Sequence, residues 1–146
     1  VVIGKTGVFA VETKGRSKLD TGNAVKDARV VYDGYVLRFP HWNERQPIQQ
    51  ARRQAKSLSQ WLSSAVGVNV GVVPVLAIPG WFIEHKKQSD VEVFMGKYPE
   101  KHFNHLKNRK PISDQLVQQI AHQIESQCRD VEPKAYVAVK PAVSTS

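Results

Sequence analysis

The sequence predicts an α/β (α+β) fold in which a mixed central β-sheet is flanked by helices. Three observations predict it: strand-like runs with turn signals near the start, an amphipathic helical pattern after Pro47, and an apolar run over 70–78. Strands followed by a helix, a further strand and more helices are typical of a sheet with helices packed on it. The length of 146 residues fits one core, so we expect a single domain over 1–130 and a C-terminal tail over 131–146.

The first forty residues contain two hairpin-like patterns. Runs rich in β-branched and aromatic residues at 1–3 and 8–14 flank a turn with glycine at both ends. After a polar, basic loop at 15–26, two further runs at 28–32 and 35–39 flank Asp33-Gly34, a strong short-range hairpin signal. We therefore expect two β-hairpins before a loop at 40–46.

The remaining elements follow from helical spacing and apolar runs. Pro47 is typical of the first position of a helix, because the missing N–H does no harm there. The apolar stripe that predicts this helix, which Gly67 should end, consists of Ile48, Ala51, Ala55, Leu58 and Leu62. We expect a central strand buried on both faces at 70–78, a shorter strand at 91–94, and a last helix with Ser113 as its N-cap.

The charge of the chain predicts an anionic partner. The formal net charge is +8 and the sequence pI is about 9.7. Residues 1–64 hold eleven Lys and Arg against five Asp and Glu, so the basic excess lies in the first half. Nucleic acid is the commonest partner of a basic domain, while an acidic protein or a lipid surface stays open as an alternative.

The start of the chain and the single cysteine lead to expectations about cellular compartment and oligomeric state. Cys128 has no second cysteine with which to form a disulfide within the chain, and we expect a cytoplasmic protein. Because Val1 is not a start Met and opens within an apolar run, we expect the natural chain to continue upstream and to leave a strand edge able to pair with another copy. Glycine and proline interrupt the apolar run at 66–83, which favours a buried strand over a membrane span.

The most informative short motif is Glu12-Thr13-Lys14 at the polar end of an apolar strand. Alternate residues of a strand share a face, so the side chains of Glu12 and Lys14 should point the same way, about 7 Å apart along the backbone. A carboxylate there can bind Mg²⁺, and an ammonium beside it can orient water or stabilise a phosphate. The alternative is an ordinary ion pair at a strand end, worth about 0–1 kcal/mol if exposed.

Longer segments around this motif resemble a known family. Residues 4–15 (GKTGVFAVETKG) and 47–55 (PIQQARRQA) closely resemble the nuclease-related domain (NERD) family, which is assigned to the PD-(D/E)XK nucleases. The resemblance continues through 74–76 and 79–82 and covers about residues 1–94. It implies a restriction-endonuclease-like fold and a metal-dependent nuclease that hydrolyses phosphodiester bonds of DNA with Mg²⁺ or Mn²⁺.

The resemblance also implies roles for individual residues. Glu12 matches the metal ligand and Lys14 the catalytic lysine, and the backbone carbonyl of Thr13 would complete the metal shell. Gln50 matches a glutamine that acts at the catalytic site, and Gln54 lies one turn further on as a supporting residue. Without the resemblance, a solvated helix face would be the favoured interpretation for both glutamines.

One departure from the family pattern leaves a second interpretation open. The superfamily carries an acidic residue on the strand before Glu-x-Lys, and no Asp or Glu lies between Val1 and Val11. One carboxylate seldom holds Mg²⁺ firmly without help from substrate phosphates. The alternative to a nuclease is therefore a catalytically inactive nucleic-acid-binding or scaffold module of the same fold.

Other polar and aromatic residues are assigned from their positions. We expect six cations to contact the phosphate backbone: Lys5, Arg16, Lys18, Arg52, Arg53 and Lys56. For the tryptophans, Trp42, Trp61 and Trp81, core packing is favoured over stacking on bases. The histidines at 102, 105 and 122 lack the spacing of a zinc site.

Overall fold

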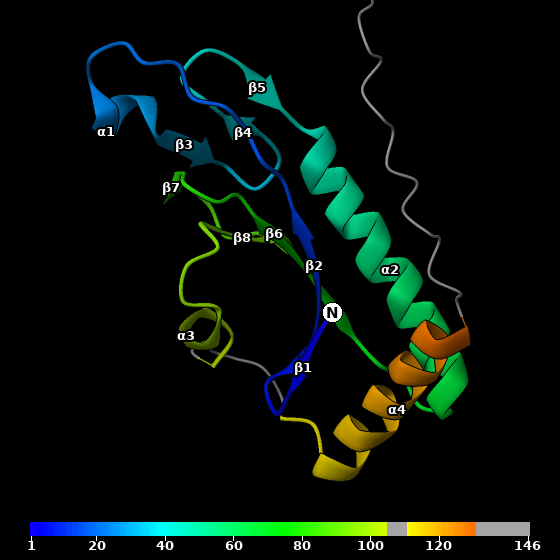
Figure 1. The fold of residues 1–146 in the computed structure, drawn as a ribbon. Coiled ribbons are helices and arrows are strands. Elements are labelled where there is room, and N and C mark those ends of the chain that lie inside the picture. The colour runs from blue at the N-terminus through cyan, green and yellow to red at the C-terminus, as the bar shows by residue number, and fades with distance from the viewer. Residues whose placement is uncertain (105–110, 131–146) are drawn as a thin grey trace, which may run out of the picture.

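The computed structural model describes residues 1–104 and 111–130 (Figure 1). Its first sheet has the strand order β1-β2-β6-β8. β1 is antiparallel to β2, whereas β2, β6 and β8 run parallel to one another. The carboxyl ends of these three parallel strands therefore meet at one edge of the sheet. The strands are β1 (Val2–Gly4), β2 (Gly7–Thr13), β6 (Val72–Ala77) and β8 (Glu92–Phe94).

A second sheet has the strand order β5-β4-β3-β7 and is also mixed. β3 pairs antiparallel with β4 and parallel with β7, and β4 pairs antiparallel with β5. The mixed α/β class is thus confirmed, with the strands distributed over two sheets. The chain passes from β6 into the second sheet through Pro79-Gly80, where Gly80 has a φ of +82°. The strands are β3 (Arg29–Tyr32), β4 (Leu37–Arg38), β5 (Asn43–Glu44) and β7 (Phe82–His85).

The longest helix lies along the first sheet and carries the residues expected to support the site. α2 (Gln46–Val66) packs on β6 and β2 through buried residues that include Ile48 and Ala51. It ends where Gly67 adopts the left-handed conformation, as the sequence predicts. α4 (Asp114–Asp130) packs on α2 and β1, and the Ser113 hydroxyl accepts the N–H of Leu116 at 3.1 Å, confirming the predicted N-cap.

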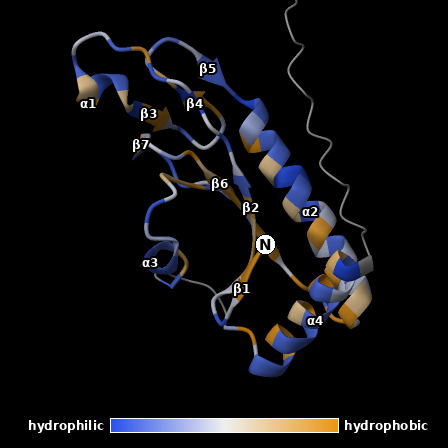
Figure 2. Cartoon of the chain, in the orientation of Figure 1, coloured by the Kyte–Doolittle hydropathy of each residue, from blue (hydrophilic) through white to orange (hydrophobic). Residues whose placement is uncertain are grey.

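The core forms on both faces of β6. Leu76 packs with Ile48 and Ala51 of α2 on one face, whereas Val75 packs with Phe9 and Phe103 on the other. Figure 2 shows the contrast between β6, which is mostly hydrophobic, and α2, along which hydrophilic and hydrophobic residues are interspersed. The prediction of a central strand buried on both faces is therefore confirmed.

Four short elements differ from the predictions. α1 (Ala24–Asp27) begins inside the predicted loop over 15–26, and β5 lies inside the predicted loop over 40–46. β7 and α3 (Pro99–Asn104) have no counterpart among the expected elements. Each spans between two and six residues, too few to repeat a helical or strand pattern. β5 forms by pairing with the nearby β4, and β7 forms by pairing with β3, which lies about fifty residues earlier in the chain.

The apolar run over 66–83 is divided among the end of α2, the strand β6 and the start of β7. Within residues 1–104 and 111–130, no helix combines the length and hydrophobicity that a membrane crossing requires. β1 is an edge strand of its sheet, which is the position that a strand-edge dimer would use. The predicted tail over 131–146 lies outside the described residues.

Candidate active site

Glu12 and Lys14 meet at the carboxyl end of β2. Glu12 Oε1 lies 3.1 Å from Lys14 Nζ, and the side chains are 19% and 27% exposed. β2 is held here by β6, because Glu12 is in register with Leu76 and the Lys14 N–H donates to the Ala77 carbonyl at 3.0 Å. The pair is thus fixed at its backbone and still open to solvent. The predicted sharing of one face is confirmed.

Gln50 reaches the same carboxylate from α2. Its Nε2 donates a hydrogen bond to Glu12 Oε1 at 3.4 Å, across 38 residues of sequence. Residues 8, 10 and 12 share the sheet face that α2 covers, because Val8 packs with Leu62 of that helix. Glu12 therefore lies on the face of β2 that α2 covers, and the Gln50 amide on α2 lies beside its carboxylate. Gln54, one turn further on, is exposed.

A second carboxylate lies close to this group. Glu44 on β5 accepts two hydrogen bonds from Arg16, from Nε at 2.8 Å and from Nη2 at 2.9 Å. The Arg16 guanidinium, then the Trp42 indole, and more weakly the charge of Lys14 hold the pKa of Glu44 below its usual range, against the effect of burial. Glu44 raises the pKa of Arg16 in return. Glu44 was absent from the expected site, since nothing local in the sequence marks it as a partner of Arg16.

A family model described as "Nuclease-related domain" (NERD) matches residues 1–79, more than half of the chain. The chain belongs to the NERD family. Neither the curated proteins nor the solved structures that were searched contain a match to it. Glu12, Lys14, Glu44 and Gln50 all lie inside the matched segment of this nuclease-related domain.

The six cations expected to bind phosphate are not all brought to one place in the NERD domain. Lys5 lies in the β1–β2 turn, and roughly 17 Å of strand separates Gly7 from Glu12. Lys18 lies over the Trp81 ring, with Nζ 5.7 Å from the ring centroid. Arg16 is paired with Glu44, as described above. Lys18 and Arg16 thus follow the Glu-Thr-Lys strand directly, whereas Lys5 lies at its far end.

The three cations of α2 lie on different sides of the helix. At about 100° per residue, Arg53 lies about 60° from Gln50, whereas Arg52 and Lys56 lie about 160° and 120° from it. Arg52 Nε and Nη2 each donate to Asp90 at 2.7 Å. This pair holds the pKa of Asp90 at about 2 and raises that of Arg52. Arg53 is therefore the α2 cation nearest to Gln50 around the helix.

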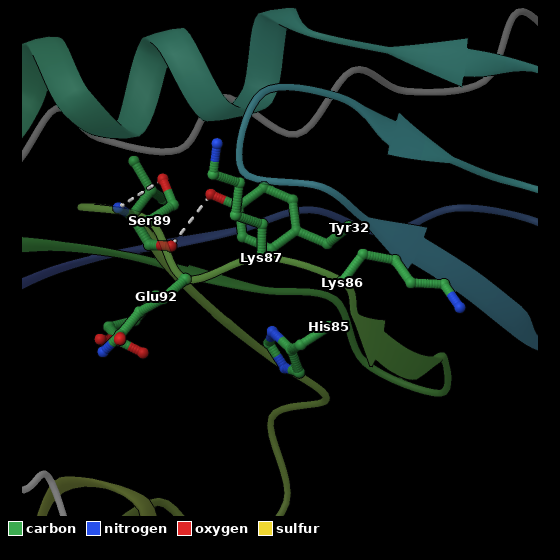
Figure 3. A pocket seen from close by; sticks show the side chains of 8 residues that line it. Tyr32, His85, Lys86, Lys87, Ser89 and Glu92 are labelled. Carbon is green, nitrogen blue, oxygen red and sulfur yellow. Dashed lines mark hydrogen bonds between the residues drawn. The ribbon is translucent and has the colours of Figure 1, made fainter.

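A hollow of about 380 Å³ lies elsewhere, on the connection between β7 and β8 (Figure 3). It is lined by Tyr32, Ser89 and the basic run His85-Lys86-Lys87, among others, and not by Glu12, Lys14 or Gln50. Two of the lining residues contact each other, because Tyr32 donates its hydroxyl to the Val91 carbonyl at 3.0 Å. The Glu12 carboxylate, the Lys14 ammonium and the Gln50 amide converge instead at the end of β2.

The tryptophans pack in the core. Trp81 is fully buried and packs against Phe39 and Trp42, while Trp61 is half-buried beside Leu58, which agrees with the expected core packing. Among residues 1–104 and 111–130, no group of three or more His, Cys, Asp and Glu is arranged to hold a metal ion. His105 lies outside the described residues.

Proposed function

We propose that this NERD domain is a metal-dependent nuclease that hydrolyses phosphodiester bonds of DNA at the end of β2. The observation that carries the proposal is the contact of Glu12 with Lys14 at 3.1 Å, where Gln50 donates to the same carboxylate oxygen. A carboxylate, an ammonium and an amide on facing elements can bind and orient a phosphodiester and a water. The membership of a nuclease-related family supports this reading of the site.

Lys14 and Gln50 would handle the charge and the geometry of the reaction. The Lys14 ammonium can donate to a non-bridging phosphate oxygen or to the attacking water, and so stabilise charge that grows in the transition state. Its backbone is fixed by the Ala77 carbonyl, which keeps the ammonium at the strand end. The Gln50 amide restricts the rotamers of the Glu12 carboxylate. These roles require contact with solvent, and both Glu12 and Lys14 have it.

The donors at the site fit Mg²⁺ or Mn²⁺ in kind, because a carboxylate and a backbone carbonyl are oxygen ligands. Glu12 would hold the ion together with the carbonyl of Thr13, the last residue of β2. When bound, the ion would polarise the phosphate and lower the pKa of a water. With one carboxylate at hand, water and substrate phosphates would supply the other ligands.

Two observations favour a second candidate, an inactive module that binds nucleic acid. No acidic residue lies between Val1 and Val11, and within the described part of the chain Glu12 belongs to no group of three or more metal-ligating side chains. Such a module would keep the basic residues near the site, Lys18 and Arg53, and bind DNA without cutting it. Metal-dependent cleavage separates the two candidates.

The test is cleavage of supercoiled plasmid and single-stranded DNA with Mg²⁺ or Mn²⁺, comparing wild type, Lys14→Ala and Lys87→Ala. Lys87 is an exposed lysine of the β7–β8 connection and serves as the matched control. We expect metal-dependent cleavage that Lys14→Ala removes and Lys87→Ala keeps. Absence of cleavage in the wild type, together with salt-sensitive DNA binding that survives Lys14→Ala, would establish the inactive module instead. Identical preparation of all three proteins controls for contaminating nuclease.

A further inference from the structure

We propose that Arg16 and Glu44 form a positioning clamp that holds the Lys14 end of β2 against the start of α2. The inference deepens the proposed nuclease function and rests on it for its catalytic consequence. Arg16 was expected to contact phosphate, and Glu44 was not expected at the site. The contacts of Arg16 indicate that it positions the Lys14 end of β2 instead of binding phosphate.

Three of the five N–H donors of the Arg16 guanidinium are already engaged. Nε and Nη2 make the two-point contact with the Glu44 carboxylate, and Nη1 donates to the Gly15 carbonyl at 2.7 Å. The planar guanidinium matches a carboxylate through two parallel hydrogen bonds, which fixes orientation as well as distance. The two side chains are 29% and 24% exposed, so the pair is partly shielded from water. Binding a phosphate through the Nε and Nη2 edge, the edge that forms the two-point contact, would require Arg16 to release Glu44.

The main chain of Arg16 is anchored as well. Its carbonyl accepts the indole N–H of Trp81 at 3.2 Å, and Trp81 is fully buried in the core. Arg16 is thus tied to the core through its backbone and to β5 through its side chain. Only Gly15 separates it from Lys14, and that glycine is exposed. Without the Arg16–Glu44 ion pair, the segment after Lys14 would be held only by the hydrogen bond from Trp81 to the Arg16 carbonyl, among the contacts described here.

These contacts close a ring around the candidate site. Glu44 immediately precedes Arg45, the N-cap of α2, and the same helix carries Gln50 back to Glu12. The ring thus runs from Glu12 through Lys14 and Arg16 to Glu44, and returns through α2. The strand side and the helix side of the site are thus joined at two places, by the Gln50–Glu12 hydrogen bond and by the Arg16–Glu44 ion pair. Because small displacements of reacting groups cost about 100-fold in rate, a loosened ring should slow catalysis.

The experiment compares Glu44→Gln with Glu84→Gln. Glu84 is a matched control, since it is 25% exposed, lies on β7 of the same sheet and also accepts an arginine, Arg29. We expect Glu44→Gln to lower kcat for plasmid cleavage by roughly 10-fold with little change in KM, and Glu84→Gln to change neither. The exchanged pair Arg16→Glu with Glu44→Arg should recover part of the lost kcat, because it restores the ion pair.

A second readout does not depend on activity. The Lys14 amide is protected by the Ala77 carbonyl, and the Val117 amide by the Ser113 carbonyl of α4. Hydrogen exchange of the Lys14 amide should accelerate by roughly 10-fold in Glu44→Gln, while exchange at Val117 stays unchanged. This arm tests the clamp even if the wild type proves inactive, a result that would defeat only the proposed function.

Three outcomes would overturn the clamp. In the first, Glu44→Gln and Glu84→Gln have the same kcat and the same exchange at Lys14. In the second, KM rises at constant kcat, which would make Arg16 and Glu44 substrate-binding residues. In the third, exchange accelerates equally at Lys14 and Val117, which would indicate general destabilisation of the fold rather than a local tie.

Discussion

The side-chain amide of Gln50 donates to Glu12 Oε1 at 3.4 Å and so joins the start of α2 to the end of β2. The same oxygen lies 3.1 Å from Lys14 Nζ. The hydrogen bond and the ion pair together hold one carboxylate oxygen from two sides. The relation between Gln50 and Glu12 also explains why a helix 38 residues away belongs to this site, and it can be tested directly.

Replacement of Gln50 should impair catalysis more than replacement of Gln54. We expect Gln50→Ala to lower kcat for DNA cleavage by about 10-fold, because the Glu12 carboxylate gains rotational freedom. Gln54→Ala removes an exposed amide of the same type from the next turn and should change kcat by less than about twofold. Steady-state cleavage kinetics of both variants provide the check. Equal losses would show that the contact between Gln50 and Glu12 has no catalytic role.

The two neighbouring arginines of α2 should differ in their effect on DNA binding. Arg53 is exposed near Gln50, whereas Arg52 is held by Asp90 through two hydrogen bonds of 2.7 Å. We expect Arg53→Ala to weaken binding uniformly across sequences and to reduce the salt slope by about 1, as for a lost phosphate contact. Fluorescence anisotropy over a NaCl series measures both quantities. A larger loss in Arg52→Ala than in Arg53→Ala would contradict the assignment.

Asp27 should make the stability of the domain sensitive to acid. Its carboxylate accepts the Thr21 hydroxyl at 2.5 Å and the Thr21 N–H at 2.8 Å, and these hydrogen bonds lower the pKa of Asp27. Because the pKa is lower in the folded state, the stabilisation is present above the unfolded value of about 3.9 and is lost as the pH falls through the folded value.

Substitution of Asp27 by Asn is therefore expected to lower Tm by a few degrees at pH 7. The difference from wild type should shrink as the pH is lowered below about 4. Asp20→Asn is the control, since Asp20 is an exposed carboxylate next to Thr21 that accepts only the Gly22 N–H among the hydrogen bonds described. Thermal unfolding followed by circular dichroism over pH 2–8 measures both variants. A Tm difference that stays constant over this pH range would show that Asp27 acts without its charge.

The regular elements of this fold were predictable because their patterns are local. The stripe from Ile48 to Leu62 and the left-handed Gly67 define α2 within its own residues. β5 was not predictable, because Asn43 and Glu44 are polar and become a strand only by pairing with β4. The second sheet likewise depends on β7 pairing with β3, which lies about fifty residues earlier in the chain. Pairings of this kind carry no periodic signal.

The candidate site likewise contains some residues that could be predicted from the sequence and others that could not. Strand periodicity places Glu12 and Lys14 on one face, and the family resemblance adds Gln50. The ion pairs of Arg16 with Glu44 and of Arg52 with Asp90 could not be predicted, since each joins loops or elements distant in sequence. Arg16 and Arg52 were both expected to contact phosphate, and each instead pairs with a carboxylate of its own chain. A basic residue indicates an anionic partner, but the sequence does not show whether that partner is a ligand or another residue of the protein.

The most direct measurement is the metal dependence of DNA cleavage by wild type, Glu12→Gln and Glu125→Gln. Glu125 is an exposed glutamate of α4 and controls for the loss of one negative charge. We predict that wild type and Glu125→Gln cleave DNA only with Mg²⁺ or Mn²⁺. Glu12→Gln should cleave about 100-fold more slowly at saturating metal while still binding DNA. Cleavage by Glu12→Gln at the rate of Glu125→Gln would contradict the assignment of the site to the end of β2.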